Sequence, residues 1–405
     1  MQSSDGNTGN RFSNFLCESE ISEKIVESIP VSTRKKCKWA VKIFMEWKQA
    51  RMENLELNDL NVYKSIDEMD KSDWNFLLKR FVFEVRKQTG DRYPPKSLYD
   101  LYAMLNFYVQ KQLAKKWSLF ADLDFAEARK CLEIAMKETS AMGILSGTKR
   151  SQSISNEDEK QLWDNGVLGK DYPNQLQNTI IYLIGIHFCI RGGRELRRLR
   201  FGSNAQIIQG EDQNNKPCLI YREDISKCNQ GGMRSIGQVP KIVYCYHNDS
   251  NHDRCLPCLF ETFIEKRPSD FASEALFLTP ISNSNDPQKW YKKCPLGRNS
   301  FDNIVKKITS DLKGRYTNQS LRRTGATRLF QSGFDEDMVS RQTGHKSSAV
   351  RIYKETSSEQ QVSLSNVLYN SKDTSSIHIR KEETEIPEIF SGTFNNCTFN
   401  VSISK

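Results

Sequence analysis

Residues 174–201 contain the most apolar helix pattern in the chain. After them the spacing of apolar residues changes from that of a helix to that of short strands, which limits the possible folds. The apolar run NTIIYLIGIHFCI is followed by Gly192 and Gly193, which are typical of a helix end. From 206 to 246, short β-prone runs are separated by Gly, Asn and Pro residues, as in a small antiparallel sheet. Helical spacing then returns. The chain is therefore predicted to be mainly α with a small antiparallel β-sheet.

Apolar residues in the N-terminal third of the chain recur at three- and four-residue spacing, which is typical of helices. One helix is expected to begin at a cap formed by Ser32 and Thr33, and another at a cap formed by Ser97. Further helical patterns cover residues 70–88 and 124–139. Lysines are expected to occupy much of the remaining surface of the first of these helices: Lys35, Lys36, Lys38, Lys42 and Lys48.

Residues 142–155 are rich in glycine, serine and basic residues, which favours a linker between two domains. Ser155 and Asp158 then have the spacing of a capping box that begins a new helix. Later helices are expected near 256–267, 298–312, 318–333, 335–343 and 357–370. The chain is thus predicted to comprise five parts: a loose N-terminal tail (1–16), a helical domain (17–140), a linker (141–155), a second domain (156–370) and a C-terminal tail (371–405).

The composition of the 405 residues, 37% hydrophobic and 27% charged, is that of a folded rather than a disordered chain. The net charge of +9 is compatible with a polyanionic partner but does not identify one. No apolar run reaches the roughly eighteen residues of a membrane span, and the N-terminus lacks the pattern of a secretory signal. The eleven cysteines are therefore expected to be reduced thiols of an intracellular protein.

Residues 316–353 bring arginine, histidine and tyrosine together in one basic stretch. Arg322 and Arg323 lie on a predicted helix, His345 completes a Gly-His pair, and Tyr353 ends the stretch. A guanidinium group binds two phosphate oxygens at once, and a phenol can attack phosphorus when its proton is removed. These residue types point to a site that holds a phosphodiester and attacks it without a metal.

Four sequence boxes, in the expected order, resemble those of the tyrosine recombinases: IRGGREL, SKCNQGG, NQSLRRTGATRLF and TGHKSSAVRIYK. The chain looks most like the Crypton transposon recombinases and their domesticated relatives, which include the C-terminal domain of MYM-type zinc-finger proteins. The resemblance implies a helical core-binding (SAM-like) domain followed by an integrase-like catalytic domain. It also implies a nuclear protein for DNA recombination and integration, which binds double-stranded DNA as a homo-oligomer without a metal or nucleotide cofactor.

The resemblance implies a role for each residue that matches a family position. Arg191 and Arg322 match the two arginines that clamp the phosphate, and Lys227 matches the hairpin lysine that protonates the leaving hydroxyl. His345 matches the histidine that hydrogen-bonds the scissile phosphate, and Tyr353 matches the nucleophile that becomes joined to the 3′ phosphate. Tyr353 would therefore carry the covalent DNA intermediate.

Two departures from the family pattern affect the expected activity. Gln319 stands where the H-x-x-R pattern has histidine, and its amide cannot accept a proton near neutral pH. Losing general-base assistance typically costs ~10²–10⁴-fold in rate. In addition, His345 and Tyr353 are one position closer in sequence than is usual in the family. Both departures favour the alternative of a domesticated, catalytically silent DNA-binding or chromatin-associated module.

Three residues of the predicted phosphate site also have simpler explanations when each is taken alone. Arg191 follows a predicted helix and could bond its last carbonyls, and Lys227 could be a surface lysine in a Gly-rich turn. Tyr353 could be a half-buried aromatic residue with a solvated hydroxyl. Arg323 matches no family position and is expected to face solvent or DNA. Only the presence of all four boxes in the expected order favours a single phosphate-binding site formed by these residues together.

Contacts to the DNA backbone are predicted from a basic helix and the linker, in two domains that clamp a duplex as in the family: Lys35, Lys36, Lys38, Lys42, Lys149 and Arg150.

A second group has residue types and short spacings that can ligate zinc: Cys245, His247, His252, Cys255 and Cys258. The resemblance requires no metal at this sheet-to-helix connection, so no metal site is assigned. A zinc-dependent transcription factor is a further alternative.

Overall fold

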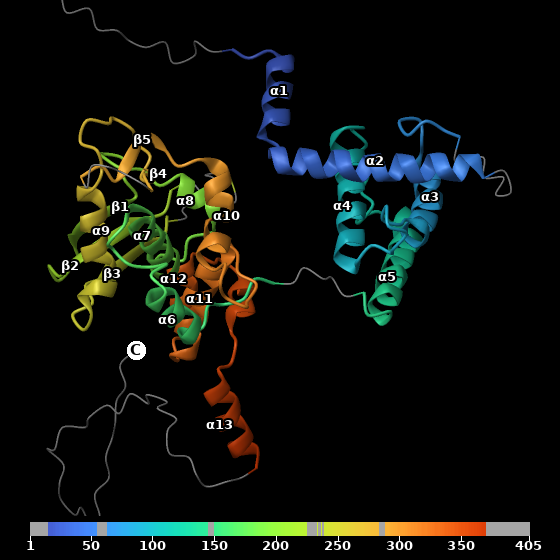
Figure 1. Ribbon diagram of the computed structural model, residues 1–405. Helices are drawn as coiled ribbons and strands as arrows, with labels where there is room; N and C mark the ends of the chain where they lie inside the picture. Colours follow the sequence, from blue (N-terminus) through green and yellow to red (C-terminus); the bar gives the residue numbers. More distant parts are fainter. Residues whose placement is uncertain are drawn as a thin grey trace, which may run out of the picture. The chain divides into compact units, whose positions relative to one another are not determined.

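A computed structural model describes residues 15–54, 63–144, 150–224, 233, 236, 239–282 and 288–369. The chain forms two compact units, Met1–Lys149 and Arg150–Lys405 (Figure 1). The predicted fold class, mainly α with small antiparallel sheets, is confirmed. In the described part of the chain, no helix is both long enough and apolar enough to cross a membrane.

The first unit is helical, as predicted. Its helices are α1 (Glu18–Ser28), α2 (Val31–Glu53), α3 (Lys71–Glu84), α4 (Pro95–Lys111) and α5 (Ala126–Ala141), with a 3₁₀ turn, η3 (Leu123–Phe125), before α5. Helix α2 packs against α4, and α3 packs against α5. Aromatic residues join the two helix pairs, because Phe44 of α2 stacks on Trp74 of α3 with ring centroids 5.3 Å apart.

The predicted starts of two helices are wrong, and proline is the reason. Helix α2 begins after Pro30 instead of at Ser32 and Thr33, and α4 begins after Pro94 instead of at Ser97. The backbone carbonyl of each proline accepts the first helical hydrogen bonds. Proline fixes φ near the helical value and has no N–H to leave unpaired, so it suits a helix start without a side-chain cap.

Lys48 was expected on the surface of α2 but is buried. Its burial lowers the pKa of its ammonium group. The cause is its position, because Lys48 follows Ala40 and Phe44 at four-residue spacing and therefore shares their buried face. The other predicted lysines of this helix, at 35, 36, 38 and 42, are exposed.

Replacing Trp74 with alanine is expected to lower the free energy of unfolding of the first unit by about 3–5 kcal/mol, the usual cost of truncating a buried tryptophan. Trp74 is 0% exposed and contacts Trp117 edge-on as well as Phe44. The measurement is urea denaturation followed by circular dichroism. Trp39, which is 40% exposed, provides the matched control. Equal losses for the Trp74→Ala and Trp39→Ala variants would contradict the assigned core.

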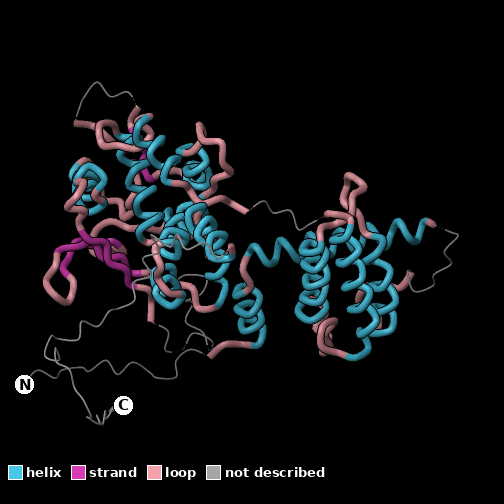
Figure 2. The backbone as a smooth tube through the Cα atoms, turned by 90° about the horizontal axis from the view of Figure 1, so that it is seen from below, coloured by secondary structure: helices cyan, strands magenta, loops and turns pink. Residues whose placement is uncertain are grey.

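The second unit combines helices with two small sheets (Figures 1 and 2). Its helices are α6 (Asn156–Asp164), α7 (Pro173–His187), α8 (Gly193–Arg197), α9 (Leu256–Glu265), α10 (Arg298–Ile308), α11 (Asn318–Gln331), α12 (Glu336–Thr343) and α13 (Ser358–Leu368), with 3₁₀ turns η5 (His252–Arg254) and η6 (Ser348–Tyr353). Its strands are β1 (Ile207–Glu211), β2 (Pro217–Arg222), β3 (Ile242–Tyr246), β4 (Leu278–Pro280) and β5 (Tyr291–Pro295).

The three-stranded sheet has the order β1-β2-β3, and both strand pairs are antiparallel, as the sequence predicts. Tyr221 of β2 lies opposite Ile207 on one side and Val243 on the other, and all three are buried. The β4–β5 pair was not predicted. Strand β4 is only three residues long and carries too few positions to show alternation.

Helices α7 and α11 pack tightly against each other in the core of the second unit. A side chain at Gly325 would lie 2.5 Å from the carbonyl oxygen of Ile186, so the two backbones approach closely there. This contact buries most of α11, including positions occupied by arginine. Helix α7 ends at His187, before the predicted stop at Gly192, because Cys189 turns the chain with a φ of 48°.

The segment predicted as a linker at 141–155 has structure at both ends in the described residues. Helix α5 extends to Ala141. At the other end, Ile154 is buried in the second unit, and its N–H donates to Oγ1 of Thr324 at 2.8 Å. Ser155 then caps α6 by accepting from the N–H of Asp158, as predicted. Residues 145–149, which include Lys149, lie outside the described residues.

Candidate functional site

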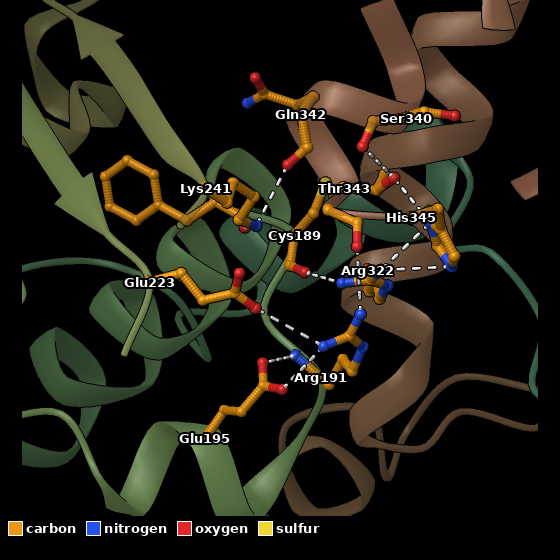
Figure 3. A network of polar contacts seen from close by, with 12 residues as sticks. Cys189, Arg191, Glu195, Glu223, Lys241, Arg322, Ser340, Gln342, Thr343 and His345 are labelled. Carbon is orange, nitrogen blue, oxygen red and sulfur yellow. Dashed lines mark hydrogen bonds and ion pairs between the residues drawn. The ribbon is translucent and has the colours of Figure 1, made fainter. Parts of the chain in front are cut away.

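Arg322 is buried in α11 at the centre of a polar network (Figure 3). Its side chain is 2% exposed, and Nη1 donates to the carbonyl oxygen of Cys189 at 2.7 Å. Burial lowers the pKa of its guanidinium group, and the nearby Arg191 acts in the same direction. Among the described residues, Arg322 has no hydrogen bond or ion pair with a carboxylate. A buried cation without a paired anion is costly, so this site has a specific need for negative charge.

Arg191 lies beside Arg322, on the connection between α7 and α8 (Figure 3). Its Nη1 pairs with Glu195 at 3.4 Å and with Glu223 at 3.6 Å. Its Nη2 donates to the carbonyl oxygen of Gly344 at 3.3 Å, which joins the segment after α7 to the end of α12. The two glutamates, which the sequence did not predict as site residues, hold this guanidinium in place. Glu195 belongs to the IRGGREL box and was the more detectable of the two.

Thr343 and Arg322 both contact the imidazole of His345. The Thr343 hydroxyl donates to the carbonyl oxygen of Val339 at 2.7 Å, and its oxygen also lies 2.7 Å from Nδ1 of His345. Nη2 of Arg322 lies 3.1 Å from Nδ1 and 3.2 Å from Nε2, so the guanidinium lies against both ring nitrogens. Neutral His345 has one ring nitrogen with a lone pair, which can accept a proton.

The pKa of His345 is lowered to about 4 by burial and by the cationic side chains of Arg322, Arg191 and Lys241. The imidazole is consequently neutral at physiological pH. A phosphate bound among these cations would cancel part of their field and raise this pKa again.

The lowered pKa of His345 predicts that the free energy of unfolding decreases in mild acid. The ordinary pKa of histidine is 6.5, so between pH 6.5 and about 4 the unfolded chain binds a proton that folded His345 does not. Stability present above pH 6.5 is lost as the pH falls through this window. Between pH 7 and 5, we expect the wild type to lose on the order of 1 kcal/mol more than the His345→Gln variant, after allowance for solvent screening. Chemical denaturation at both pH values measures this; equal losses would contradict the assigned environment.

Lys241 is the lysine that the described structure places in this network. It precedes β3, and its Nζ donates to the carbonyl oxygens of Phe188 at 2.6 Å and Gln342 at 3.1 Å. Burial lowers the pKa of this ammonium group to about 8. No sequence box contains Lys241, so the sequence did not indicate it. Lys227, the lysine implied by the resemblance, lies outside the described residues.

Tyr353 ends η6 next to the arginine cluster. Its side chain is 8% exposed, and its ring centroid lies 5.4 Å from that of His345. Its carbonyl oxygen accepts from Oγ1 of Thr327 on α11 at 3.0 Å. The two rings are therefore in contact, although His345 and Tyr353 are one position closer in sequence than the family resemblance implies. Gln319 is exposed in the first turn of α11, one turn before Arg322.

Arg323 was expected to face solvent or DNA, and this prediction is wrong. Its side chain is buried, and Nη2 bonds Glu355 at 2.6 Å and the carbonyl oxygen of Ile352 at 3.1 Å. Its guanidinium carbon lies 5.6 Å from the ring centroid of Tyr353. The second arginine of the pair thus supports the segment that carries the tyrosine, whereas the first faces Arg191.

Two family models match separate parts of the chain. The QRICH1 domain matches residues 34–139, and a domain of unknown function, DUF3504, matches residues 153–310. Zinc finger MYM-type protein 2 of Homo sapiens is 24% identical over 294 residues, which cover 67% of this chain and 21% of that protein. The predicted resemblance to MYM-type zinc-finger proteins is confirmed.

Further similar proteins include uncharacterized protein KIAA1958 of Homo sapiens, which is 23% identical over 314 residues, 75% of this chain and 41% of that protein. The chain thus spans about a fifth of the MYM-type relatives and less than half of KIAA1958. Among solved structures, XerH site-specific recombinase bound to palindromic difH substrate is similar, with a TM-score of 0.49, 16% identity and coverage of 87% of this chain and 85% of that chain. The Tn1549 transposon integrase in complex with transposon right end DNA has a TM-score of 0.43, 14% identity and coverage of 87% and 99%.

Proposed function

We propose that the second unit binds a scissile phosphate of double-stranded DNA between Arg191 and Arg322, and breaks and rejoins the strand through Tyr353. The observation that carries this proposal is the buried guanidinium of Arg322, which has a second guanidinium beside it and no bond to a carboxylate among the described residues. The non-bridging oxygens of a phosphodiester would supply the missing charge, and each guanidinium can bind two of them.

The reaction would be a transfer of the phosphoryl group from DNA to the protein. The phenol oxygen of Tyr353 attacks phosphorus, and the bond from phosphorus to the 5′ oxygen breaks. A 3′-phosphotyrosyl bond forms, and the freed 5′ oxygen takes a proton, which by family resemblance comes from Lys227. The reverse reaction with another 5′ hydroxyl rejoins the strand. Positioning and charge stabilisation by the arginines would supply most of the catalysis.

His345 would accept the proton of the Tyr353 hydroxyl. Gln319 cannot do so, because an amide is not a base near neutral pH. The neutral imidazole of His345 has one ring nitrogen with a lone pair, and its ring centroid lies 5.4 Å from that of Tyr353. A bound phosphate would also raise the lowered pKa of His345, which would make it a better base when substrate is present.

The exposed lysines of α2 would contact DNA phosphates outside the site. Lys35, Lys38 and Lys42 follow the three- and four-residue spacing of one helix face, and the buried residues Ala40 and Phe44 occupy the opposite face. Lys36 and Arg150 are also exposed and would add backbone contacts. Recombination would require a homo-oligomer, because each copy cuts one strand, and a DNA role places the protein in the nucleus.

A catalytically silent DNA-binding module is the second candidate function, and Gln319 favours it. An exposed amide replaces the usual histidine, while the arginine cluster that would grip DNA is complete. Such a module would bind DNA through the same arginines and lysines but would form no covalent bond.

One experiment separates these functions. Duplexes that the full chain binds are first selected from a random-sequence pool, and nicked suicide substrates are then made from them. A tyrosine recombinase is expected to form a protein–DNA adduct that survives a denaturing gel. Binding whose affinity falls steeply with salt, without any adduct on any nicked substrate, would overturn cleavage and support the binding module. Failure to select any duplex would overturn both.

A further inference from the structure

We propose that His247, Cys255 and Cys258, completed by His252, form a zinc-binding site in the second unit, separate from the arginine cluster. One potential ligand atom from each of the first three residues lies within 4.8 Å of the other two. Imidazole nitrogen and thiolate sulfur are the donors that zinc prefers in proteins, whereas magnesium and calcium prefer oxygen. The donor set therefore selects the class of metal.

The distances between the donor atoms fit one tetrahedral ion. Zinc–sulfur bonds of about 2.3 Å and zinc–nitrogen bonds of about 2.0–2.1 Å place two tetrahedral ligands roughly 3.5–3.8 Å apart. Nδ1 of His247 lies 3.4 Å from Sγ of Cys258 and 3.7 Å from Sγ of Cys255. Nδ1 of His252 lies 3.9 Å from Sγ of Cys258, but its donor atoms are not within 4.8 Å of all three other ligands. The exposed side chain of His252 would therefore have to rotate toward the ion to complete the coordination shell.

The local structure explains why these side chains converge. His247 directly follows β3, His252 begins the 3₁₀ turn η5, and Cys255 caps the N-terminus of α9. Cys258 lies in the first turn of the same helix. The loop between β3 and α9 folds back, so that His247 faces Cys255 and Cys258.

The environment of Cys255 suits a metal-bound thiolate better than an ordinary buried thiol. Its sulfur is 0% exposed and accepts the backbone N–H of Asn248 at 3.3 Å. N–H bonds to coordinating sulfur are the outer-shell contacts that orient metal ligands.

The site would join β3 to α9 in the second unit. Strand β3 has the candidate metal ligand His247 after its C-terminal end, while Lys241 precedes its N-terminal end and reaches the arginine cluster. Zinc would therefore stabilise the strand that positions Lys241 without contacting the phosphate site. With four protein ligands the role would be structural, since a catalytic zinc keeps one open position.

The test uses the purified full chain and cobalt(II) as a spectroscopic substitute for zinc. One equivalent of cobalt is expected to give thiolate charge-transfer bands and the intense visible bands of tetrahedral coordination. The Cys258→Ser variant should weaken both, because only the Cys255 thiolate remains. Cys294→Ser, at an exposed cysteine of β5, is the matched control and should keep the wild-type spectrum. A wild-type spectrum without these bands, or the same spectrum in Cys258→Ser, would overturn the site.

A second measurement keeps the proposal testable if the Cys258 variant does not fold. Wild-type protein as purified should contain one equivalent of zinc by elemental analysis. Removing it with a chelator under reducing conditions should lower the melting temperature of the second unit, and adding zinc back should restore it. An unchanged melting temperature would overturn the structural role.

His252→Ala should retain charge transfer but shift the visible bands; an unchanged spectrum would overturn His252 as the fourth ligand.

Discussion

Replacing Tyr353 with phenylalanine is expected to abolish the covalent DNA adduct and to leave DNA affinity within about twofold of the wild type. Only the hydroxyl would carry the phosphoryl group. The ring would remain in place, because it packs against His345 and Arg323 and its backbone is held by Thr327. The change therefore removes the nucleophile without removing the contacts that organise the site.

The adduct assay for Tyr353→Phe needs a control tyrosine with similar burial. Tyr316 is also 8% exposed, lies in the same unit and donates its hydroxyl to Asp158, outside the arginine cluster. Tyr316→Phe should therefore keep the adduct while losing about 1 kcal/mol of stability. Persistence of the adduct in Tyr353→Phe would show that another residue is the nucleophile. Mass spectrometry of the trapped peptide would then identify it.

The helices and the sheet could be predicted because each leaves a periodic pattern in the sequence. Apolar spacing located α3 and α5, and short β-prone runs separated by Gly, Asn and Pro located β1 to β3. The errors lie at the ends of helices, where a single residue can determine where the helix begins or ends. Pro30 replaced the predicted serine and threonine cap, and Cys189 turned the chain before the expected glycines. Pro30 was a start signal that the sequence contained, whereas the φ of 48° at Cys189 is a backbone angle that residue type does not fix.

The order of the sequence boxes predicted the residues of the phosphate site. The structure brings four of them together: Arg191, Arg322, His345 and Tyr353. Their partners could not be predicted in the same way. Lys241 reaches the network from a strand start, about one hundred positions before His345, and Glu223 reaches it from the end of the sheet. Neither belongs to a box, so only tertiary structure reveals them.

Burial was the least predictable property of the site. Adjacent arginines on a helix suggest a solvated or DNA-facing surface, because charged side chains are rarely buried. Both Arg322 and Arg323 are buried here, since α11 packs against α7 on one side and η6 on another. Arg323 has the carboxylate partner that a buried arginine normally needs, Glu355. This contrast between the two neighbours supports the proposal that Arg322 is the arginine that binds the phosphate.

Replacing Arg322 with lysine is expected to reduce the single-turnover rate of adduct formation by ~10²–10³-fold, the usual effect of removing one preorganised donor to a developing oxyanion. Lysine keeps the positive charge but loses the planar fork. It cannot donate to the carbonyl oxygen of Cys189, reach His345 and hold two phosphate oxygens at the same time. The rate should therefore fall more than the affinity for DNA.

The matched control for this change is Arg351→Lys. Arg351 lies on η6, is mostly exposed and pairs with Glu336, so its replacement should leave the rate unchanged. Circular dichroism and salt-dependent DNA binding would establish that Arg322→Lys remains folded. If it does not, Arg191→Lys tests the same charge cluster from a less buried position, because Glu195 and Glu223 remain to orient the new ammonium group. A wild-type rate in a folded Arg322→Lys variant would exclude this guanidinium as the phosphate ligand, and with it the proposed mechanism.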